Sequence, residues 1–389
     1  MENFVLHNPT KIIFGRDTVP LIGKETVTFG KNVLLVYGRN SLKKSGLYDA
    51  ITSALQDSGA KITEHSGVQT NPLHFHVMEG VEKCKAHSCD VICAAGGGSV
   101  IDEAKAISAG ALVRHDVWKF LTGKKSIKKT LPVTAVPTLA ASGSEANSGM
   151  VITHEIKKLK FGFANRHLFP RTSILDPVTT CSVPASYTAY GSVDMLSHFL
   201  ELYFSCSGKE SPVQDSLMEG MITNIIRSTD RCLAARDDYN ARAELMWIAS
   251  LALNGIFSAG LGRVEFPLHL IEHAISALYG VPHGAGLAII IPGWMRYSKE
   301  KQSLRMAQLG EKSLSIKEGT ADSTSDAAIE YLLQWFNSIN VPTSLEDIGV
   351  EVKDISRIAD NALAQAKVWR MKNISAEVIE QVLHLCRRR

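Results

Sequence analysis

The chain has 389 residues, more than a single hydrophobic core usually organises, so we expect two domains of roughly 150–200 residues each. Hydrophobic residues make up 45% and charged residues 21%, a balance that excludes a disordered, collagen-like or coiled-coil chain. The 42 basic and 39 acidic side chains nearly cancel, and the apolar runs are shorter than the roughly 18–20 residues that span a bilayer. We therefore expect neither nucleic-acid nor membrane binding.

The N-terminus and the cysteines bear on localisation. The first residues lack the basic start and apolar middle of a signal peptide. Seven cysteines, an odd number with no Cys-x-x-Cys pair, are typical of a reducing compartment. These features predict a cytoplasmic protein.

The first part of the chain alternates between strand-like and helix-like segments. Five short runs rich in β-branched residues favour strands, at residues 11–14, 33–37, 61–64, 90–95 and 131–136. Several are apolar at consecutive positions, as in a parallel sheet that is covered on both faces. Three segments between them favour helices, at residues 41–58, 72–87 and 100–110. This alternation predicts a doubly wound α/β domain.

After Pro184 the pattern changes to helices alone. Six segments have helical spacing of apolar residues, at 185–206, 209–234, 238–258, 261–279, 322–339 and 375–386. Convincing strand runs are absent there, and Ser186 is a candidate N-cap for the first helix. We place the boundary near residues 178–185, which gives an α/β domain over 1–182 and an all-helical domain over 183–389.

A glycine-rich turn follows the predicted strand 90–95. Gly96, Gly97, Gly98 and Ser99 connect it to the helix at 100–110, where backbone amides and the helix N-terminus attract an anion such as a diphosphate. The spacing matches neither Gly-x-Gly-x-x-Gly nor a Walker loop, and a tight structural turn is the alternative interpretation. Asp102 lies one turn into the helix. As an alternative to a role in cofactor binding, it would only stabilise the helix N-terminus.

The loop after the second predicted strand bears on the choice of cofactor. An acidic residue at this place usually binds a ribose 2′-hydroxyl and repels a 2′-phosphate. Here the loop carries donors and basic residues instead: Gly38, Arg39, Asn40 and Ser41, with Lys43 and Lys44 just beyond. This composition predicts a preference for NADP(H) over NAD(H), with a solvated basic turn as the alternative.

Metal-ligand residue types recur at helical spacing in the second domain. Asp194 and His198 lie four residues apart, as do His269 and His273, so each pair shares one face of a predicted helix. His283 follows ten residues later. One carboxylate with three imidazoles suits Fe²⁺ or Zn²⁺. The spacing leaves open which three of the four histidines bind the metal, and a helical metallohydrolase is an alternative.

Several of these stretches resemble motifs of the iron-dependent (group III) alcohol dehydrogenases. One signature is similar to residues 174–176, Pro184 and 191–201, and the second to residues 269–286. Residues 96–102 and 137–145 resemble the cofactor-binding elements. The motifs occur in family order over nearly the whole chain. The likeness is greatest to the branch of NADP-dependent butanol dehydrogenases and broad aldehyde reductases.

The resemblance implies the fold that this family shares with dehydroquinate synthases. An α/β dinucleotide-binding domain would precede an all-helical metal-binding domain, with a deep cleft between them. The implied metal ligands are Asp194, His198, His269 and His283. His273 would then be a catalytic histidine near the nicotinamide, either as a proton relay or as a packing residue.

The resemblance also implies where the cofactor binds. Gly97, Gly98 and Ser99 would hold the diphosphate. Further residues would lie along the cofactor: Asp102, Thr138, Leu139, Ser142, Lys160 and the loop residues Gly38, Asn40 and Ser41. Two departures from the family pattern stand out. Arg39 and Asn40 replace two glycines common in the NADP-using branch, and residues 141–145 vary the usual Thr-Gly-Ser-Glu stretch.

The expected function is hydride transfer between NADP(H) and a short-chain alcohol or aldehyde, such as butanol or butanal, assisted by one Fe²⁺ or Zn²⁺ ion. The family suggests a homodimer. A lyase of the dehydroquinate synthase type is the main alternative, but it would need basic residues around the metal to bind an acidic substrate. Residues 264–295 contain no lysine or arginine.

Overall fold

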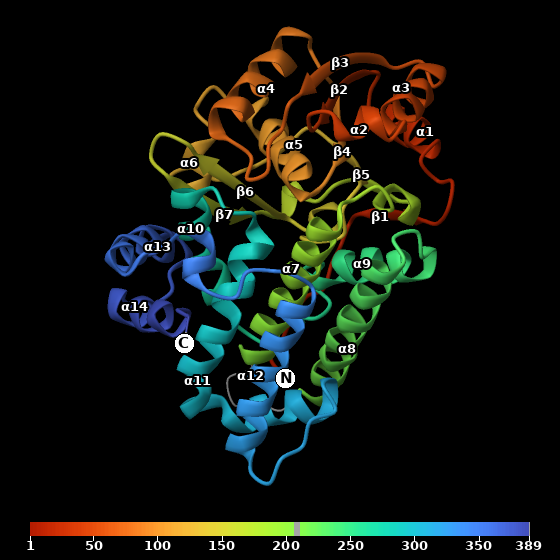
Figure 1. Ribbon diagram of the computed structural model, residues 1–389. Helices are drawn as coiled ribbons and strands as arrows, with labels where there is room; N and C mark the ends of the chain where they lie inside the picture. The colour runs from red at the N-terminus through yellow and green to blue at the C-terminus, as the bar shows by residue number, and fades with distance from the viewer. Residues whose placement is uncertain (206–210, 389) are drawn as a thin grey trace. The chain divides into compact units, whose positions relative to one another are not determined.

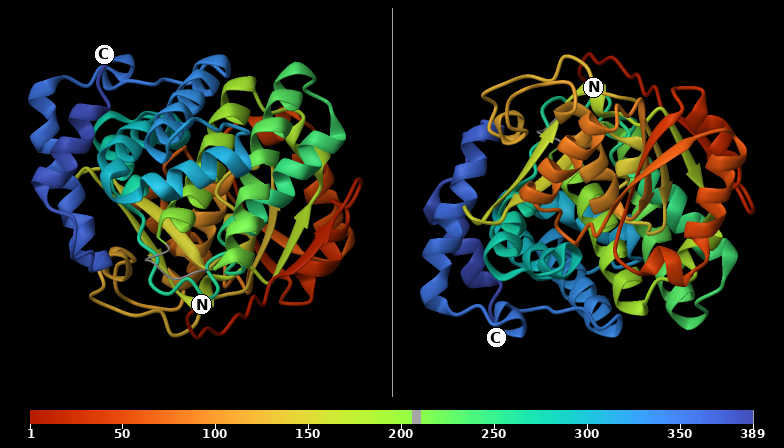
Figure 2. Two further views of the ribbon diagram at one scale, coloured as in Figure 1. Left: turned by 90° about the horizontal axis from the view of Figure 1, so that it is seen from below. Right: turned by 90° about the horizontal axis from the view of Figure 1, so that it is seen from above.

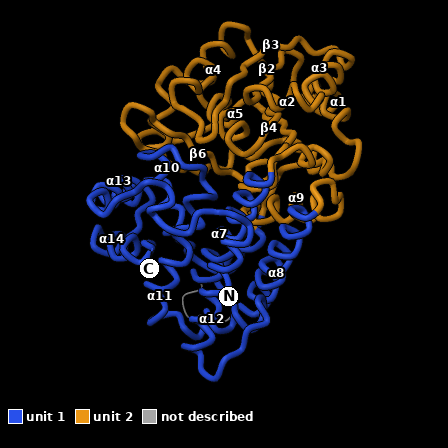
Figure 3. The backbone as a smooth tube through the Cα atoms, viewed as in Figure 1, with its two compact units in different colours: residues 1–6, 185–234, 256–389 blue, residues 7–184, 235–255 orange. Residues whose placement is uncertain are grey.

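The computed structural model describes residues 1–205 and 211–388 of the chain (Figure 1). It separates into two units, coloured in Figure 3. Residues 7–184 and 235–255 form the first, here called the α/β unit. Residues 1–6, 185–234 and 256–389 form the second, here called the helical unit.

This division departs from the predicted cut at residue 182 in two places. Residues 1–6 join the helical unit, where the backbone N–H of Glu2 donates to the carbonyl of Gly260 at 2.8 Å. Helix α9 (Tyr239–Ala252) joins the α/β unit, because Ser250 on α9 donates a hydrogen bond to the buried Glu145 at 2.5 Å. Contacts between residues so distant in sequence leave no trace in local periodicity.

The α/β unit is organised around a six-stranded parallel sheet with the order β1-β8-β5-β4-β2-β3. Its strands are β1 (Lys11–Phe14), β2 (Asn32–Tyr37), β3 (Lys61–Ser66), β4 (Val91–Gly96), β5 (Val133–Pro137) and β8 (Thr172–Leu175). Five of them overlap the predicted runs. The short β8 was not predicted, nor was the separate antiparallel pair β6 (Gly149–His154) and β7 (Leu159–Ala164).

Helices cover both faces of this sheet, as Figure 2 shows. They are α1 (Leu21–Val27), α2 (Ser41–Lys44), α3 (Leu47–Asp57), α4 (His74–Ala86) and α5 (Gly98–Gly110). The short α6 (Trp118–Leu121) packs against β7 instead. On β2, Val33 and Leu35 pack into one core cluster with α1 and α3, while Leu34 and Val36 are equally buried. Alternate side chains of a strand face opposite sides of the sheet. Helices cover both sides here, so consecutive residues of β2 are all apolar.

The predicted helix at 41–58 is in fact two helices. Gly46 between α2 and α3 has φ of 77°, a left-handed conformation that interrupts the helical hydrogen bonds. The predicted helix at 100–110 begins two residues earlier, at Gly98, directly after β4. The glycine turn is therefore part of the first turn of α5.

The helical unit contains only helices and short turns among its described residues. Its α-helices are α7 (Ala185–Phe204), α8 (Pro212–Ala234), α10 (Pro267–Tyr279), α11 (His283–Ser313), α12 (Ala321–Ser338), α13 (Ile355–Trp369) and α14 (Ala376–Leu385). The predicted ends at residues 206 and 209 lie outside the described residues. Within residues 1–205 and 211–388, no helix has the length and apolar character required to cross a bilayer.

Helices α11 and α13 were not predicted. The first part of α11 is buried on all sides, as residues 284–293 show, and it runs through Pro292. A helix that is buried on every side has no apolar stripe, so its sequence lacks the amphipathic pattern of a surface helix. A proline normally marks the end of a helix, so Pro292 also argued against one here. Gly284 allows α11 to begin against α7, because a Cβ there would lie 2.0 Å from the carbonyl oxygen of Tyr190.

Candidate functional site

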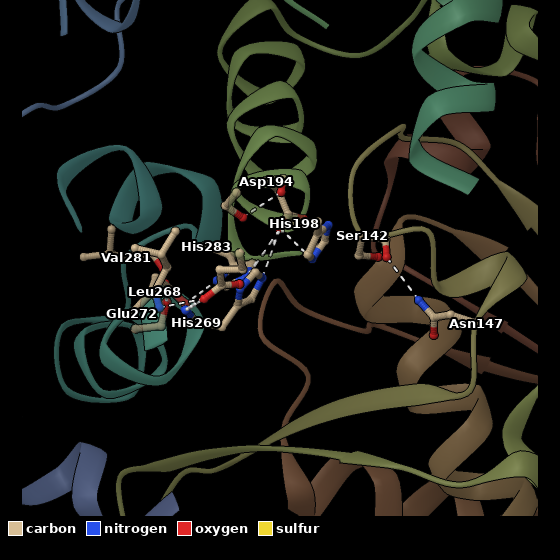
Figure 4. A network of polar contacts seen from close by, with 12 residues as sticks. Ser142, Asn147, Asp194, His198, Leu268, His269, Glu272, Val281 and His283 are labelled. Carbon is tan, nitrogen blue, oxygen red and sulfur yellow. Dashed lines mark hydrogen bonds and ion pairs between the residues drawn. The ribbon is translucent and has the colours of Figure 1, made fainter. Parts of the chain in front are cut away.

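Three imidazoles from three helices of the helical unit converge on one carboxylate oxygen of Asp194 (Figure 4). Asp194 and His198 lie one turn apart on α7, His269 comes from α10, and His283 is the first residue of α11. The Nε2 atoms of His198, His269 and His283 lie 3.5, 3.7 and 3.5 Å from Oδ1 of Asp194. These are the four residues that the family resemblance implied as metal ligands.

The residues fit a divalent ion. Ligand atoms about 2.1 Å from a tetrahedral ion are about 3.4 Å apart, close to the observed distances. Oδ1 of Asp194 and Nε2 of His269 are buried and have no hydrogen-bond partner. Buried polar atoms rarely stay unpartnered, and a cation would satisfy both.

Two further carboxylates orient the histidines from outside this set. Nδ1 of His269 lies 2.5 Å from Oε2 of Glu201, whose other oxygen accepts the backbone N–H groups of Leu268 (2.6 Å) and His269 (3.1 Å) at the start of α10. Nδ1 of His283 bonds Glu272. In His269 and His283 the Nδ1 atom is engaged, so Nε2 is the nitrogen available to a metal, whereas Nδ1 of His198 has no partner.

Sequence reasoning assigned no role to either carboxylate. Glu201 was noticed only as part of a motif. Glu272 sits between His269 and His273 in the stretch His-Leu-Ile-Glu-His, a signal that passed without interpretation. On α10 it also accepts a hydrogen bond from Ser276, four residues on. This contact holds the carboxylate in place beside His283.

Burial and neighbouring charges set the protonation of the cluster. Burial lowers the pKa of His198 to about 4, so its imidazole is neutral. Burial also disfavours the charge on His269, but the carboxylates of Glu201 and Asp194 raise its pKa to about 10. Burial opposes ionisation of Asp194, yet His198 and His283 hold the pKa of its carboxyl well below the usual range. A metal ion would therefore displace a proton from His269.

His273 is not among the histidines around Oδ1 of Asp194, although one of its ring nitrogens lies within 4.8 Å of ligand atoms of Glu272 and His283. Its Nδ1 is 3.0 Å from Oε1 of Gln365 on α13, and its ring packs 5.8 Å from that of Trp369. The rings of His269 and His273 are perpendicular at 6.1 Å. Gln365 was not predicted, because α13 itself was not. The assignment of His273 as the non-ligand histidine remains a prediction.

The glycine turn of the α/β unit packs tightly against residues 139–142. A Cβ on Gly98 would lie 2.2 Å from Oγ of Ser142, and one on Gly97 would lie 3.5 Å from Leu139. Gly97 precedes α5 without a side-chain cap, so the first backbone N–H groups of the helix remain available to an anion. Oγ of Ser142 is buried without a partner, although the carbonyl of Ser142 accepts from Asn147 at 3.2 Å (Figure 4).

The other predicted cofactor residues are spread around this turn. Thr138 lies next to it, with its N–H donating to the carbonyl of Gly96 at 3.1 Å. Asp102 accepts hydrogen bonds from Ser144 (2.5 Å) and from the backbone of Val151 (3.0 Å), so it ties α5 to β6. Lys160 is buried on β7. Contact of each with the cofactor remains a prediction.

A carboxylate from the neighbouring strand lies close to the loop after β2. Gly38 is half-buried and Asn40 and Ser41 are exposed, as expected for a binding loop. Nζ of Lys43, however, lies 4.6 Å from the ring centre of Tyr48, whose hydroxyl donates to Glu64 at 2.8 Å. Hydrogen bonds, Tyr37 first, lower the pKa of Glu64. This carboxylate comes from the neighbouring strand β3.

Comparison with known proteins identifies relatives for both units. Residues 9–177 match the family model described as iron-containing alcohol dehydrogenase, and residues 188–387 match the C-terminal model of the same family. A probable NADH-dependent butanol dehydrogenase 1 of Bacillus subtilis is 40% identical, covering 98% of this chain and 99% of the relative. The NADPH-dependent aldehyde reductase YqhD of Escherichia coli is 34% identical, covering 91% of each chain.

A solved structure agrees along the whole chain. The crystal structure of NADH-dependent butanol dehydrogenase A from Thermotoga maritima superposes with a TM-score of 0.96 at 40% identity. It covers 100% of this chain and 99% of that one. The expected combination of an α/β unit and a helical unit is thereby confirmed.

The metal assignment makes a testable distinction between two neighbouring histidines. His269→Ala should bind about one iron or zinc ion per chain fewer than the wild type, because it removes a ligand. His273→Asn should retain the wild-type content, because His273 lies outside the ligand set. Elemental analysis of protein purified without oxygen measures both. Metal loss on substitution of His273, with retention in His269→Ala, would show that the two roles are reversed.

Proposed function

Because this chain belongs to the iron-containing alcohol dehydrogenase family, we propose that it transfers hydride between a nicotinamide cofactor and a short-chain alcohol or aldehyde, such as butanol or butanal. The protein is an NAD(P)-linked oxidoreductase. The observation that carries the proposal is the position of three imidazole nitrogens within 3.7 Å of one unpartnered carboxylate oxygen of Asp194.

The side chains at this site suit a Lewis acid. When bound, Fe²⁺ or Zn²⁺ would polarise the substrate oxygen while the nicotinamide gives or takes the hydride. Asp194, His198, His269 and His283 would hold the ion. A single carboxylate among three imidazoles leaves the site with a net positive charge, which favours an alkoxide over a neutral alcohol. Glu201 and Glu272 keep the imidazoles oriented.

We assign the proton transfer to His273. In the neutral tautomer its Nδ1–H donates to Oε1 of Gln365, so Nε2 is the nitrogen that exchanges a proton. Oε1 of Gln365 accepts the Nδ1–H hydrogen bond but does not remove the proton from Nδ1. Gln365 therefore fixes the tautomer and the orientation of the His273 ring. Reduction of an aldehyde requires a proton for the new alkoxide; the imidazolium of His273 would supply it from Nε2 and return to the neutral tautomer with its proton on Nδ1.

The loop at 38–44 supports NADP(H) as the preferred cofactor. It contains no carboxylate, and the exposed Arg39 and Lys44 offer positive charge to a 2′-phosphate. Glu64 weakens this argument, because it lies close enough to Lys43 to offset part of that charge. The relatives use both cofactors: the Bacillus protein is named for NADH and the Escherichia coli protein for NADPH.

We further propose that the enzyme is a cytoplasmic homodimer. The six cysteines among the described residues are free thiols, which fits a reducing compartment. The edge strand β1 exposes Phe14, whose ring contacts the exposed Trp247 at 6.0 Å. A second subunit would cover this apolar pair.

The cofactor preference can be measured directly. With aldehydes of two to eight carbons, we expect kcat/KM to be at least about tenfold higher with NADPH than with NADH. Replacing Arg39 with glycine should reduce that ratio, because it removes a partner of the 2′-phosphate, whereas Lys24→Ala on α1 serves as a control. Equal or better use of NADH by the wild type would overturn the preference. Failure to oxidise either cofactor would overturn the proposed function.

The role of His273 is separable from metal binding. His273→Asn should lower kcat for aldehyde reduction by about 10²–10⁴-fold, since general acid catalysis contributes that much, with metal content unchanged. Because an acid must be protonated to act, the fall of kcat at high pH should disappear with it. If kcat falls less than threefold in the metal-loaded variant, His273 is a packing residue.

A further inference from the structure

We propose that the α/β unit holds a second divalent-cation site, suited to Zn²⁺, formed by His74, His154 and Glu155 with Asp116 beside them. The site shares no residue with the metal centre of the helical unit or with the cofactor residues. One ligand atom from each of His74, His154 and Glu155 lies within 4.8 Å of the other two. Two imidazoles with carboxylates are ligands that favour zinc.

The backbone brings these residues together. His74 is the first residue of α4, His154 is the last residue of β6, and Glu155 opens the turn that leads to β7 (Figure 1). The N–H of Thr153 donates to the carbonyl of Pro72 at 2.8 Å, which fixes the end of β6 against the start of α4. The spacing of the side chains is therefore set by a main-chain contact and not by rotamer choice alone.

Two buried polar atoms of the cluster lack partners. His154 is only 8% exposed, and its Nδ1 has no hydrogen-bond partner among the described residues. Oε2 of Glu155 is likewise buried and unpartnered. Buried polar atoms rarely remain without a partner, and a bound cation would satisfy both.

The surroundings resemble the outer partners of a metal site. Nε2 of His74 lies 2.8 Å from Oδ1 of Asp116, the carboxylate–imidazole pairing that commonly orients a ligating histidine. Trp118 contacts both imidazoles edge-on, with ring centres 5.9 Å from His74 and 4.9 Å from His154. The rings of His74 and His154 are thereby held in place.

The arrangement repeats a feature of the centre on α7 and α10. There the rings of His198 and His269 stack at 4.7 Å with 9° between their planes. Here His74 and His154 stack at 4.8 Å with 19°. Asp116 and Glu155 supply two negative charges against the one of Lys157.

A second histidine cluster in the α/β unit differs from this one. Nε2 of His65 and Nδ1 of His76 both bond the same oxygen of the buried Glu103, at 2.9 and 2.5 Å. Their nitrogens already have a partner, and Nε2 of His76 has the carbonyl of Ser66 at 3.2 Å. Oε2 of Glu103 is buried without a partner, but the histidine nitrogens that face this carboxylate are already hydrogen-bonded, so we assign no metal to the cluster.

Zinc counting tests the proposal. Full-length wild type, His154→Ala and Glu155→Gln are loaded with excess ZnCl₂, dialysed against metal-free buffer and analysed for zinc per chain. Both variants should retain one zinc ion fewer than the wild type. His87→Ala, an exposed histidine at the end of α4, is the matched control and should retain the wild-type number.

The same variants separate the two metal sites. His269→Ala should lose the other ion, and the double variant His154→Ala/His269→Ala should hold none. Circular dichroism shows whether each variant is folded. If His154→Ala does not fold, the zinc content of Glu155→Gln alone tests the proposed site. Wild-type zinc content in both His154→Ala and Glu155→Gln would overturn the proposed site.

Discussion

The carboxylate of Asp194 among three imidazoles is the arrangement on which the helical unit depends. Without a cation, Oδ1 of Asp194 and Nε2 of His269 are buried and have no hydrogen-bond partner. Burying unpartnered polar atoms is unfavourable in a protein interior. When a cation is bound, each of these atoms would have the ion as its partner. Helices α7, α10 and α11 each contribute a ligand, so the ion would also connect the three helices that form the centre of the unit.

Carboxylates outside the ligand set extend this constraint along the chain. Glu201 links the ligand His269 to the N-terminus of α10, where two backbone N–H groups converge on it. Glu272 links His283 to the opposite end of α10 through Ser276, which also donates to the carbonyl of Val281. The positions of the ligands are thus tied to the ends of helices, where the backbone has hydrogen-bonding groups to spare.

The sequence predicted features correctly where the pattern of residues lies within a single helix or strand. The buried strand β2 and the paired positions of Asp194 and His198 on α7 were predictable, because their periodicity is complete within a few residues. The boundaries of the two units were not, because Ser250 reaches Glu145 across about a hundred residues of sequence. Helix α11 escaped prediction because burial on every side removes the amphipathic pattern.

The same reasoning explains which site residues could be predicted. The ligands are histidines and an aspartate at helical spacing, whereas Gln365 contacts His273 only through the packing of α13 against α10. Glu64 reaches the loop after β2 because β3 pairs beside β2, a neighbour relation that the order of elements alone does not give. Residues that act through a neighbouring element require the structure.

The most direct test of the metal centre is anomalous diffraction at the iron edge from crystals grown without oxygen in the presence of Fe²⁺. The account predicts a strong peak in the helical unit, about 2.0–2.2 Å from Oδ1 of Asp194 and from Nε2 of His198, His269 and His283. A peak bonded to His273 in place of one of these histidines, or no peak among them, would contradict it.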